Sequence, residues 1–154
     1  MQSINKNPSS MTLRDIPASI FISTYGNFLK NSGQIQLPSW IEIIKSGPHK
    51  IYSPASNDWV YSRFASLVRR IYINGGQGVG KLRKIFGGKK KRGSKPSIKK
   101  SSGGKIVRLA LKELERLKII EKNSTGRRYI TKKARKDIDI RSKKIFLTLE
   151  NHHK

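Results

Sequence analysis

The chain has 154 residues, the length of one ordinary domain, and contains no cysteine, which excludes disulfides and thiolate metal sites. Lysine and arginine together number 34 against nine aspartates and glutamates, a formal charge of +25. A compact body this basic repels itself, so the charge indicates a polyanionic partner, with nucleic acid first and an acidic membrane surface second. No apolar run approaches the about 18–20 residues that span a bilayer, so we expect a soluble intracellular protein with no membrane partner.

The first part of the chain predicts two long helices joined by a polar linker. Residues 1–14 are polar and are expected to form a flexible tail. Apolar residues then recur at helical spacing, and Gly33 suits a left-handed cap, so a helix is expected from about Asp15 to Gly33. A short extended piece and a helical turn follow, reaching residue 44, and a second long helix is expected to end at Gly75.

Two segments after the second helix are expected to lack helical structure. Residues 79–88 alternate between apolar and polar side chains and are bracketed by glycines, which favours a strand. Residues 89–104 are rich in lysine, serine and glycine and contain almost nothing apolar. We therefore expect an exposed, basic, flexible loop over 89–104.

The last part of the chain has the element order helix, hairpin, helix. A clean apolar stripe predicts a helix over 105–118, and a glycine-containing turn between two short β-prone runs predicts a β-hairpin over 119–131. Thr131 caps a last helix, and residues 149–154 are expected to form a C-terminal tail.

A helix followed by a tight hairpin, after two earlier helices, is the element order of a winged helix. In that interpretation residues 105–118 form the recognition helix and residues 119–131 form the wing. We therefore expect a mainly α fold with a small β-hairpin, arranged as one winged-helix-like domain of about five helices over residues 15–148. Other small α+β domains also contain a helix followed by a hairpin.

The acidic residues are unevenly distributed. Between Asp58 and Glu113 there is no aspartate or glutamate, and this acid-free segment, residues 59–112, holds sixteen lysines and arginines. A salt-bridged solvent face needs alternating signs, so the segment indicates a surface that contacts the phosphates of a nucleic acid, the alternative being plain solubility. For Arg63 a further alternative is packing of its stem against its own helix. The candidate RNA-binding residues are Arg63, Arg69, Arg70, Lys81, Arg83, Lys84, Lys89, Lys90, Lys91, Arg92, Lys95, Lys105, Arg108 and Lys112.

Glycines are concentrated beside these cations, where they would let the backbone approach RNA closely. They are Gly75, Gly76, Gly78, Gly80, Gly87 and Gly88. The run from Gly75 to Lys81 also satisfies G-x-x-x-x-G-K, but Leu82 offers no hydroxyl to magnesium, and a helix is expected where such a loop needs a preceding strand. We therefore expect no nucleotide-binding loop and no cofactor.

The sequence contains few residues that could form a catalytic or metal site. The acids are scattered, and of the three histidines two lie at the C-terminus. No nucleophile–base set or metal-ligand cluster is visible, so we expect neither an enzyme, nor a metal site, nor a small-molecule substrate.

Seven stretches of the sequence resemble a known family, the eukaryotic and archaeal small-subunit ribosomal protein nineteen. The similarity extends in one register from about residue 15 to 145. The stretches are Phe28–Gly33, Leu37–Trp40, Asp58–Ser66, Ile73–Gly80, Lys84–Gly88, Leu111–Lys118 and Gly126–Thr131.

The resemblance implies a mostly helical, winged-helix-like protein in the head of the small ribosomal subunit. Such a protein binds ribosomal RNA beside neighbouring head proteins, supports maturation of the small-subunit RNA precursor and has no catalytic activity. It implies a cytoplasmic ribosome location with nuclear and nucleolar passage during assembly. Basic positions of the family are matched here by Arg63, Arg69, Lys84 and Arg108. RNA contacts in 89–104 are inferred from charge alone, because that segment is more lysine-rich than the family pattern.

Two other functions remain open from the sequence. One is a winged-helix DNA-binding regulator that reads base edges with Lys105, Arg108, Lys112 and Arg116, although such helices usually carry Asn, Gln or Ser. The other is a small NTPase that uses Lys81.

Overall fold

The computed structural model describes residues 11–152. A 3-10 helix (Leu13–Asp15) precedes the first α-helix, and a second one (Ser39–Glu42) lies between the first two α-helices. The remaining elements are α1 (Ala18–Asn31), α2 (Trp59–Asn74), α3 (Val79–Ile85), β1 (Gly88–Arg92), β2 (Lys95–Lys100), α4 (Gly104–Arg116), β3 (Ile120–Lys122), β4 (Arg128–Ile130) and α5 (Lys132–His152). The expectation of a mainly helical fold with about five helices and a hairpin is confirmed.

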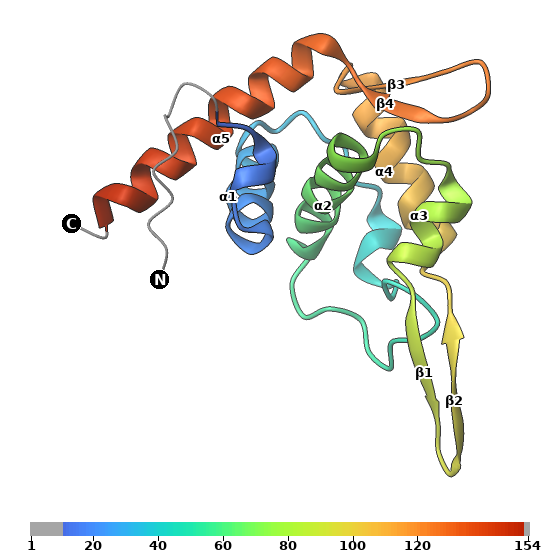
Figure 1. Cartoon of the computed structure of the whole chain (residues 1–154). Coiled ribbons are helices and arrows are strands. Elements are labelled where there is room, and N and C mark those ends of the chain that lie inside the picture. Colours follow the sequence, from blue (N-terminus) through green and yellow to red (C-terminus); the bar gives the residue numbers. More distant parts are fainter. Residues whose placement is uncertain (1–10, 153–154) are drawn as a thin grey trace.

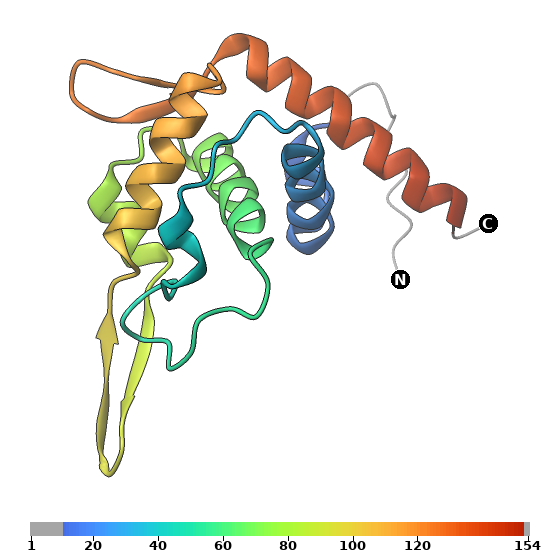
Figure 2. The same ribbon diagram turned by 180° about the vertical axis from the view of Figure 1, so that it is seen from behind.

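The helices form a layered body from which two hairpins emerge (Figures 1 and 2). Helices α1 and α2 pack against each other, α3 packs on α4, and α5 crosses the end of α1 and extends beyond it. The β1–β2 hairpin extends from one end of the α3–α4 pair as a long ribbon, and the β3–β4 hairpin lies at the other end. The acid-free segment therefore runs through α2, α3, the β1–β2 hairpin and most of α4.

The core forms where the apolar stripes of α1, α2 and α4 meet, as their helical spacing predicts. Phe21 and Leu29 from α1 pack in one cluster with Phe64, Leu67 and other residues of α2. The stripe of α4 completes this cluster with Ile106, Val107, Ala110, Leu111 and Leu114. This leaves the polar edges of the same helices at the surface, where they hold cations rigidly.

The wing-like hairpin is confirmed within the predicted range 119–131. Ile120 pairs with Ile130 in an antiparallel register, and Thr131 caps α5, its hydroxyl accepting the backbone N–H of Ala134 at 3.2 Å. An additional β-bridge between Gln77 and Arg128 ties the turn after α2 to strand β4. The buried Gln77 side chain also donates to the Gly75 carbonyl at 2.6 Å, which fixes that turn.

The predicted strand over 79–88 is wrong, because residues 79–85 form helix α3. Leu82 is fully buried, and the N–H of Phe86 donates to its carbonyl at 3.0 Å. Gly78 supplies the extended residue before the helix and Phe86 the C-cap. The short run of alternating residues gave no means of distinguishing one apolar helical face from a strand.

The segment 89–104, expected to be a flexible loop, is mostly the β1–β2 hairpin followed by the start of α4. Lys89 pairs with Lys99 and Arg92 with Lys95, around a turn in which Gly93 has a φ of 70°. This hairpin is held by its backbone hydrogen bonds and buries almost no side chain. Its sequence therefore lacks the alternation of apolar and polar residues that would predict strands.

The predicted tails are also shorter than expected where the structure describes them. Met11 and Leu13 are buried, so the packed part of the chain begins before residue 15, and residues 1–10 lie outside the described range. At the other end α5 continues to His152, through most of the expected tail at 149–154. Residues 153–154 are not described. The single-domain boundaries stay a prediction.

Candidate nucleic-acid interface

The acid-free segment carries cations without carboxylate partners. The ion pairs of the described chain join Lys30 to Asp58, Arg116 to Glu113 and Arg128 to Glu115, at 2.7–2.9 Å. None of these pairs, within residues 11–152, includes a lysine or arginine of the acid-free segment. Arg116, which would extend the cation row along α4, is instead held by Glu113 and by the carbonyl of Gln34. Ion pairs among the described residues therefore leave the positive charge of the segment uncompensated.

Two guanidinium groups converge at the start of α4. A Cβ placed on Gly104 would lie 3.0 Å from Nη1 of Arg108 and 3.2 Å from Nε of Arg83. Arg83 reaches this position from α3, donating from Nε to the Ser102 carbonyl at 3.2 Å. Cations are unfavourable at a helix N-terminus, since the helix dipole is positive there. No acid lies in this part of the sequence, so a bound anion is the arrangement that would stabilise it.

The outer face of α4 continues this surface. Lys105, Arg108 and Lys112 are exposed at spacings of three and four residues, so they line one side of the helix. The ammonium of Lys105 sits 4.1 Å from the centroid of the Trp40 ring, which positions it beside the 3-10 helix Ser39–Glu42. Lys81 is exposed on the neighbouring α3. These cations are therefore attached to regular, packed structure.

The β1–β2 hairpin adds a ribbon of exposed cations. Residues paired across antiparallel strands share a face of the hairpin. Lys95 and Lys99 are four residues apart on β2 and therefore point to the same face. Their partners on β1, Arg92 and Lys89, share that face, so four cations lie on one side of the hairpin. Like charges directly opposite each other are destabilising. At the base of the ribbon, Lys84 of α3 lines a hollow of about 250 Å³ with Lys99, Lys100 and Ser101. The remaining predicted cations of the hairpin, Lys90 and Lys91, are exposed as well.

The arginines of α2 are held more tightly. The guanidinium of Arg63 lies 4.5 Å from the centroid of the Phe86 ring, and burial lowers the pKa of Arg63 from its ordinary value. This ring partner follows α3 and so lies outside the helix that carries Arg63. Arg69 and Arg70 are half-buried, and each has a buried Nε without a hydrogen-bond partner in the described chain. Their contacts with RNA stay a prediction.

Four of the six predicted glycines face other parts of the protein. A Cβ at Gly76 would lie 2.9 Å from the Tyr129 hydroxyl, and Gly75 is packed against the same ring. A Cβ at Gly87 would run into the Lys100 carbonyl, and one at Gly88 would lie 2.9 Å from the His49 ring. Each of these four thus has a packing role. Gly78 and Gly80 face open space, which is what a close backbone approach to RNA requires.

The loop that adjoins β1 carries cations that were not predicted as site residues from the sequence. Lys45, Lys50 and the strongly exposed Tyr52 lie beside Lys89, Lys90 and Lys91, around a recess. This loop is far from β1 in the sequence, so only the fold brings the two together. The available sequence signal was the adjacent pair of large side chains, Ile51 and Tyr52, in an otherwise polar linker.

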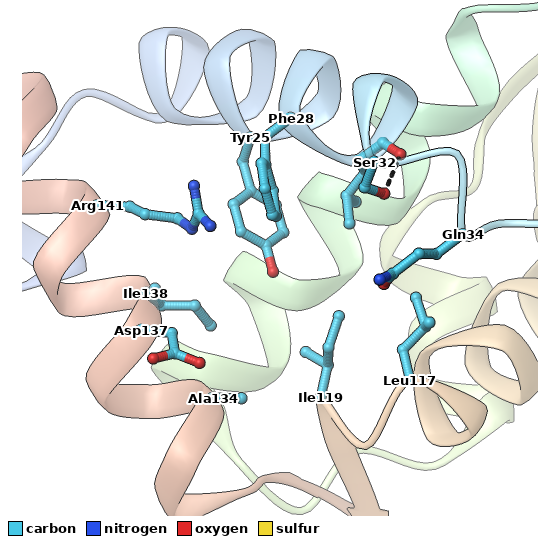
Figure 3. A pocket seen from close by; sticks show the side chains of 11 residues that line it. Tyr25, Phe28, Ser32, Gln34, Leu117, Ile119, Ala134, Asp137, Ile138 and Arg141 are labelled. Carbon is cyan, nitrogen blue, oxygen red and sulfur yellow. Dashed lines mark hydrogen bonds between the residues drawn. The ribbon is translucent and has the colours of Figure 1, made fainter.

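A second recess, of about 160 Å³, lies outside the acid-free segment, between α1, α5 and residues 117–119 (Figure 3). Tyr25 and Phe28 line it from α1, and the Arg141 guanidinium packs 3.5 Å from the Phe28 ring centroid. Burial raises the pKa of Tyr25 to about 12, so its phenol is neutral. Because Asp137 also lines this recess, it lacks the purely cationic character of a phosphate site.

Other site types have no support in the part of the chain that is described. Within residues 11–152 no helix is long and apolar enough to span a bilayer. Among residues 11–149, whose side chains are described, no three histidines, aspartates or glutamates gather as metal ligands would. The run from Gly75 to Lys81 follows helix α2, as expected, and leads into α3, so it has no preceding strand.

Comparison with known proteins identifies the relatives of this chain. The family described as ribosomal protein S19e matches residues 12–148. "Small ribosomal subunit protein eS19" of Dictyostelium discoideum is 39% identical over 139 residues, covering 90% of this chain and 94% of that protein. The protein of the same name from Oryza sativa is 38% identical over 131 residues, covering 85% and 90%. "Small ribosomal subunit protein eS19B" of Schizosaccharomyces pombe is 37% identical, covering 85% and 92%. The chain therefore belongs to the ribosomal protein S19e family, whose members are structural components of the ribosome and not enzymes.

Proposed function

We propose that this protein is a constituent of the small ribosomal subunit that binds ribosomal RNA in the subunit head and supports maturation of the small-subunit RNA precursor. The observation that carries the proposal is the convergence of Arg83 and Arg108 at the N-terminus of α4, in a segment without a single acid. Relatives named as small-subunit proteins support the assignment to the small subunit. The position in the head is proposed from the family resemblance of the sequence.

The physical basis is phosphate neutralisation by cations held on a rigid scaffold. The candidate residues on α3, the β1–β2 hairpin and α4 are mostly exposed and unpaired, so they are free to replace counterions on RNA. The flanking packed helices keep them in place, which reduces the entropy lost on binding. Neighbouring head proteins are the second class of partner in this proposal.

A DNA-reading role is less well supported. The exposed residues of α4 are Lys105, Arg108, Lys112 and Arg116, and the last is engaged with Glu113. Base-edge readout usually draws on Asn, Gln or Ser beside arginine, and α4 offers none of these. This composition suits phosphate contacts better than sequence recognition.

Passage through the nucleus is part of the proposal, because ribosomal RNA precursors are assembled there in eukaryotes. The run Lys89–Arg92 is exposed on β1 and has the composition of a nuclear import signal. The same residues could serve import before assembly and RNA contact afterwards. Replacing them with glutamine and following a fluorescent fusion would test the import role.

The test of RNA binding uses two charge-matched variants. Lys81→Glu, Arg108→Glu and Lys112→Glu change three exposed residues of the acid-free segment. The control replaces Lys132, Lys133 and Lys136, exposed residues of α5, with glutamate, so both variants lose the same net charge.

If the protein neutralises about ten phosphates, the logarithm of its affinity falls with the logarithm of salt with a slope of about −7 to −9. The first variant should reduce the size of this slope by about 2 to 3, and the control should leave it nearly unchanged. In cells, the control should co-sediment with small subunits after a high-salt wash and the first variant should not, with unprocessed small-subunit RNA accumulating. Equal behaviour of the two variants would contradict the proposal.

A further inference from the structure

A recess of about 570 Å³ lies between the loop 45–52 and strand β1, and its charge is entirely positive. Five lysines line it, two from the loop and three from the strand, and no acid does; they are Lys45, Lys50, Lys89, Lys90 and Lys91. The volume falls in the range of about 300–1,000 Å³ that is usual for small-ligand sites. The recess thus combines the size of a ligand site with the charge of a phosphate site.

The inner wall of the recess is a fixed aromatic ring. The His49 imidazole lies between two backbone segments: a Cβ on Gly47 would be 2.8 Å from its Cε1, and a Cβ on Gly88 would be 2.9 Å from its Cδ2. Both positions are therefore glycine because the ring occupies the space. Its Nδ1 is buried without a partner in the described chain, and burial with the nearby charges of Lys50 and Arg63 lowers the pKa of His49. The ring is accordingly neutral near pH 7.

The rim of the recess presents exposed apolar surface. Tyr52 is 82% exposed and Ile51 is 66% exposed, although both line the recess. An exposed aromatic ring beside lysines does not stabilise the free protein, because the hydrophobic surface of the ring stays in water. Aromatic rings in this setting are the platforms on which unpaired bases stack.

We propose that this recess binds one unpaired nucleotide of the RNA, with the base stacked on Tyr52 and the flanking phosphates held by the surrounding lysines. The inference rests on the proposed function, since the nucleotide belongs to the RNA that the protein binds. A paired base could not enter, because its faces are covered by its neighbours in the duplex. An acidic peptide would be attracted by the lysines alone, and it would not account for the exposed tyrosine.

The experiment compares two short RNA duplexes, one fully paired and one identical except for a single bulged 4-thiouridine. The full-length protein should bind the bulged duplex about tenfold more tightly. Tyr52→Ala should weaken binding of the bulged duplex by about fivefold to tenfold, which removes most of the bulge preference, and leave binding of the paired duplex within about twofold. Tyr52→Phe keeps the ring and should match the wild type. Ile43→Ala, at an equally exposed residue outside the recess, is the control for altered surface.

A second measurement uses intact small subunits that contain the full-length protein. Ultraviolet irradiation followed by mass spectrometry should find a nucleotide adduct on the peptide that contains Tyr52. An adduct together with the loss of bulge preference in Tyr52→Ala supports the proposal.

The other outcomes overturn it in distinguishable ways. If both duplexes bind equally, with strong salt dependence and no effect of Tyr52→Ala, the nucleotide site is wrong while the RNA-binding function stands. If neither duplex binds in a salt-dependent manner, the proposed function fails and the nucleotide site fails with it. If Tyr52 in the subunit cross-links to a protein, the recess is a protein-docking site and the proposal is wrong.

Discussion

The hydroxyl of Tyr72 joins α2 to α5 through a single carboxylate. It donates to Asp139 with 2.6 Å between the oxygens, and the backbone N–H of Leu13 donates to the same carboxylate at 3.4 Å. Tyr72 is buried, and the Arg135 guanidinium lies 4.9 Å from its ring centroid. Tyr72→Phe would keep the ring and this cation–π contact and remove only the hydroxyl.

We expect Tyr72→Phe to lower the free energy of unfolding by about 1.5–3 kcal/mol. Hydrogen bonds to charged groups contribute about this much, and of its hydrogen bonds with described residues Asp139 would keep the long contact with Leu13 alone. The assay is guanidinium denaturation of the wild type, Tyr72→Phe, Asp139→Ala and the double variant. In the Asp139→Ala background, the tyrosine substitution should cost less than about 0.5 kcal/mol, because its partner is already absent.

The matched control is Tyr61→Phe on the same helix. Tyr61 is half-buried, and its hydroxyl has no hydrogen-bond partner within residues 11–152, so its removal should change stability by less than about 0.5 kcal/mol. The reasoning would be refuted if Tyr72→Phe destabilised the Asp139→Ala protein as much as the wild type. The loss would then come from ring packing and not from the hydrogen bond.

Two further predictions concern alkaline pH and the glycines. Burial raises the pKa of Tyr25 from 10.0 to about 12, so this group stabilises the fold fully below pH 10 and loses that contribution as pH rises through about 12. Denaturation at pH 9 and 11 should show a loss roughly 1 kcal/mol greater for the wild type than for Tyr25→Phe. Gly87→Ala should destabilise the protein by about 1–3 kcal/mol, because the new Cβ meets the Lys100 carbonyl. Gly80→Ala, with nothing within 4 Å inside α3, should stabilise it by up to about 1 kcal/mol, and thermal melts of the two variants would contradict this if they coincided.

Elements that bury an apolar face or contain a characteristic turn could be predicted from the sequence. The stripe of α4 and the hairpin around Gly126 are in the expected places, since apolar spacing and a glycine turn are local signals. Helix α3 was missed because seven residues give only two turns, with one fully buried side chain, Leu82. The β1–β2 hairpin was missed because its strands bury almost nothing, and backbone pairing leaves no mark on side-chain polarity.

The candidate site was predicted in its charge but not in its geometry. The acid-free segment is a property of the sequence, whereas the meeting of Arg83 with Arg108 depends on the packing of α3 against α4. Arg63 could be assigned to a helix edge, but its partner Phe86 is placed by the tertiary fold. The loop bearing His49 and Tyr52 contains too few cations to predict a binding site from its sequence. Its place beside the lysines of β1 depends on the tertiary fold.

The cations that are proposed to bind RNA are also those that destabilise the free protein. Lys89 faces Lys99 across the hairpin, and two guanidiniums lie at the positive end of α4; none of the ion pairs among the described residues includes these cations. The fold remains stable in spite of this repulsion because its apolar core and the contacts of the Glu113, Glu115 and Asp139 carboxylates, which do not involve these cations, stabilise it. A bound polyanion would relieve the repulsion, so binding and stability are linked: each phosphate that binds also weakens an unfavourable interaction within the protein. The regular helices and paired strands hold these cations close to one another in spite of their repulsion, which the proposed binding of RNA would relieve.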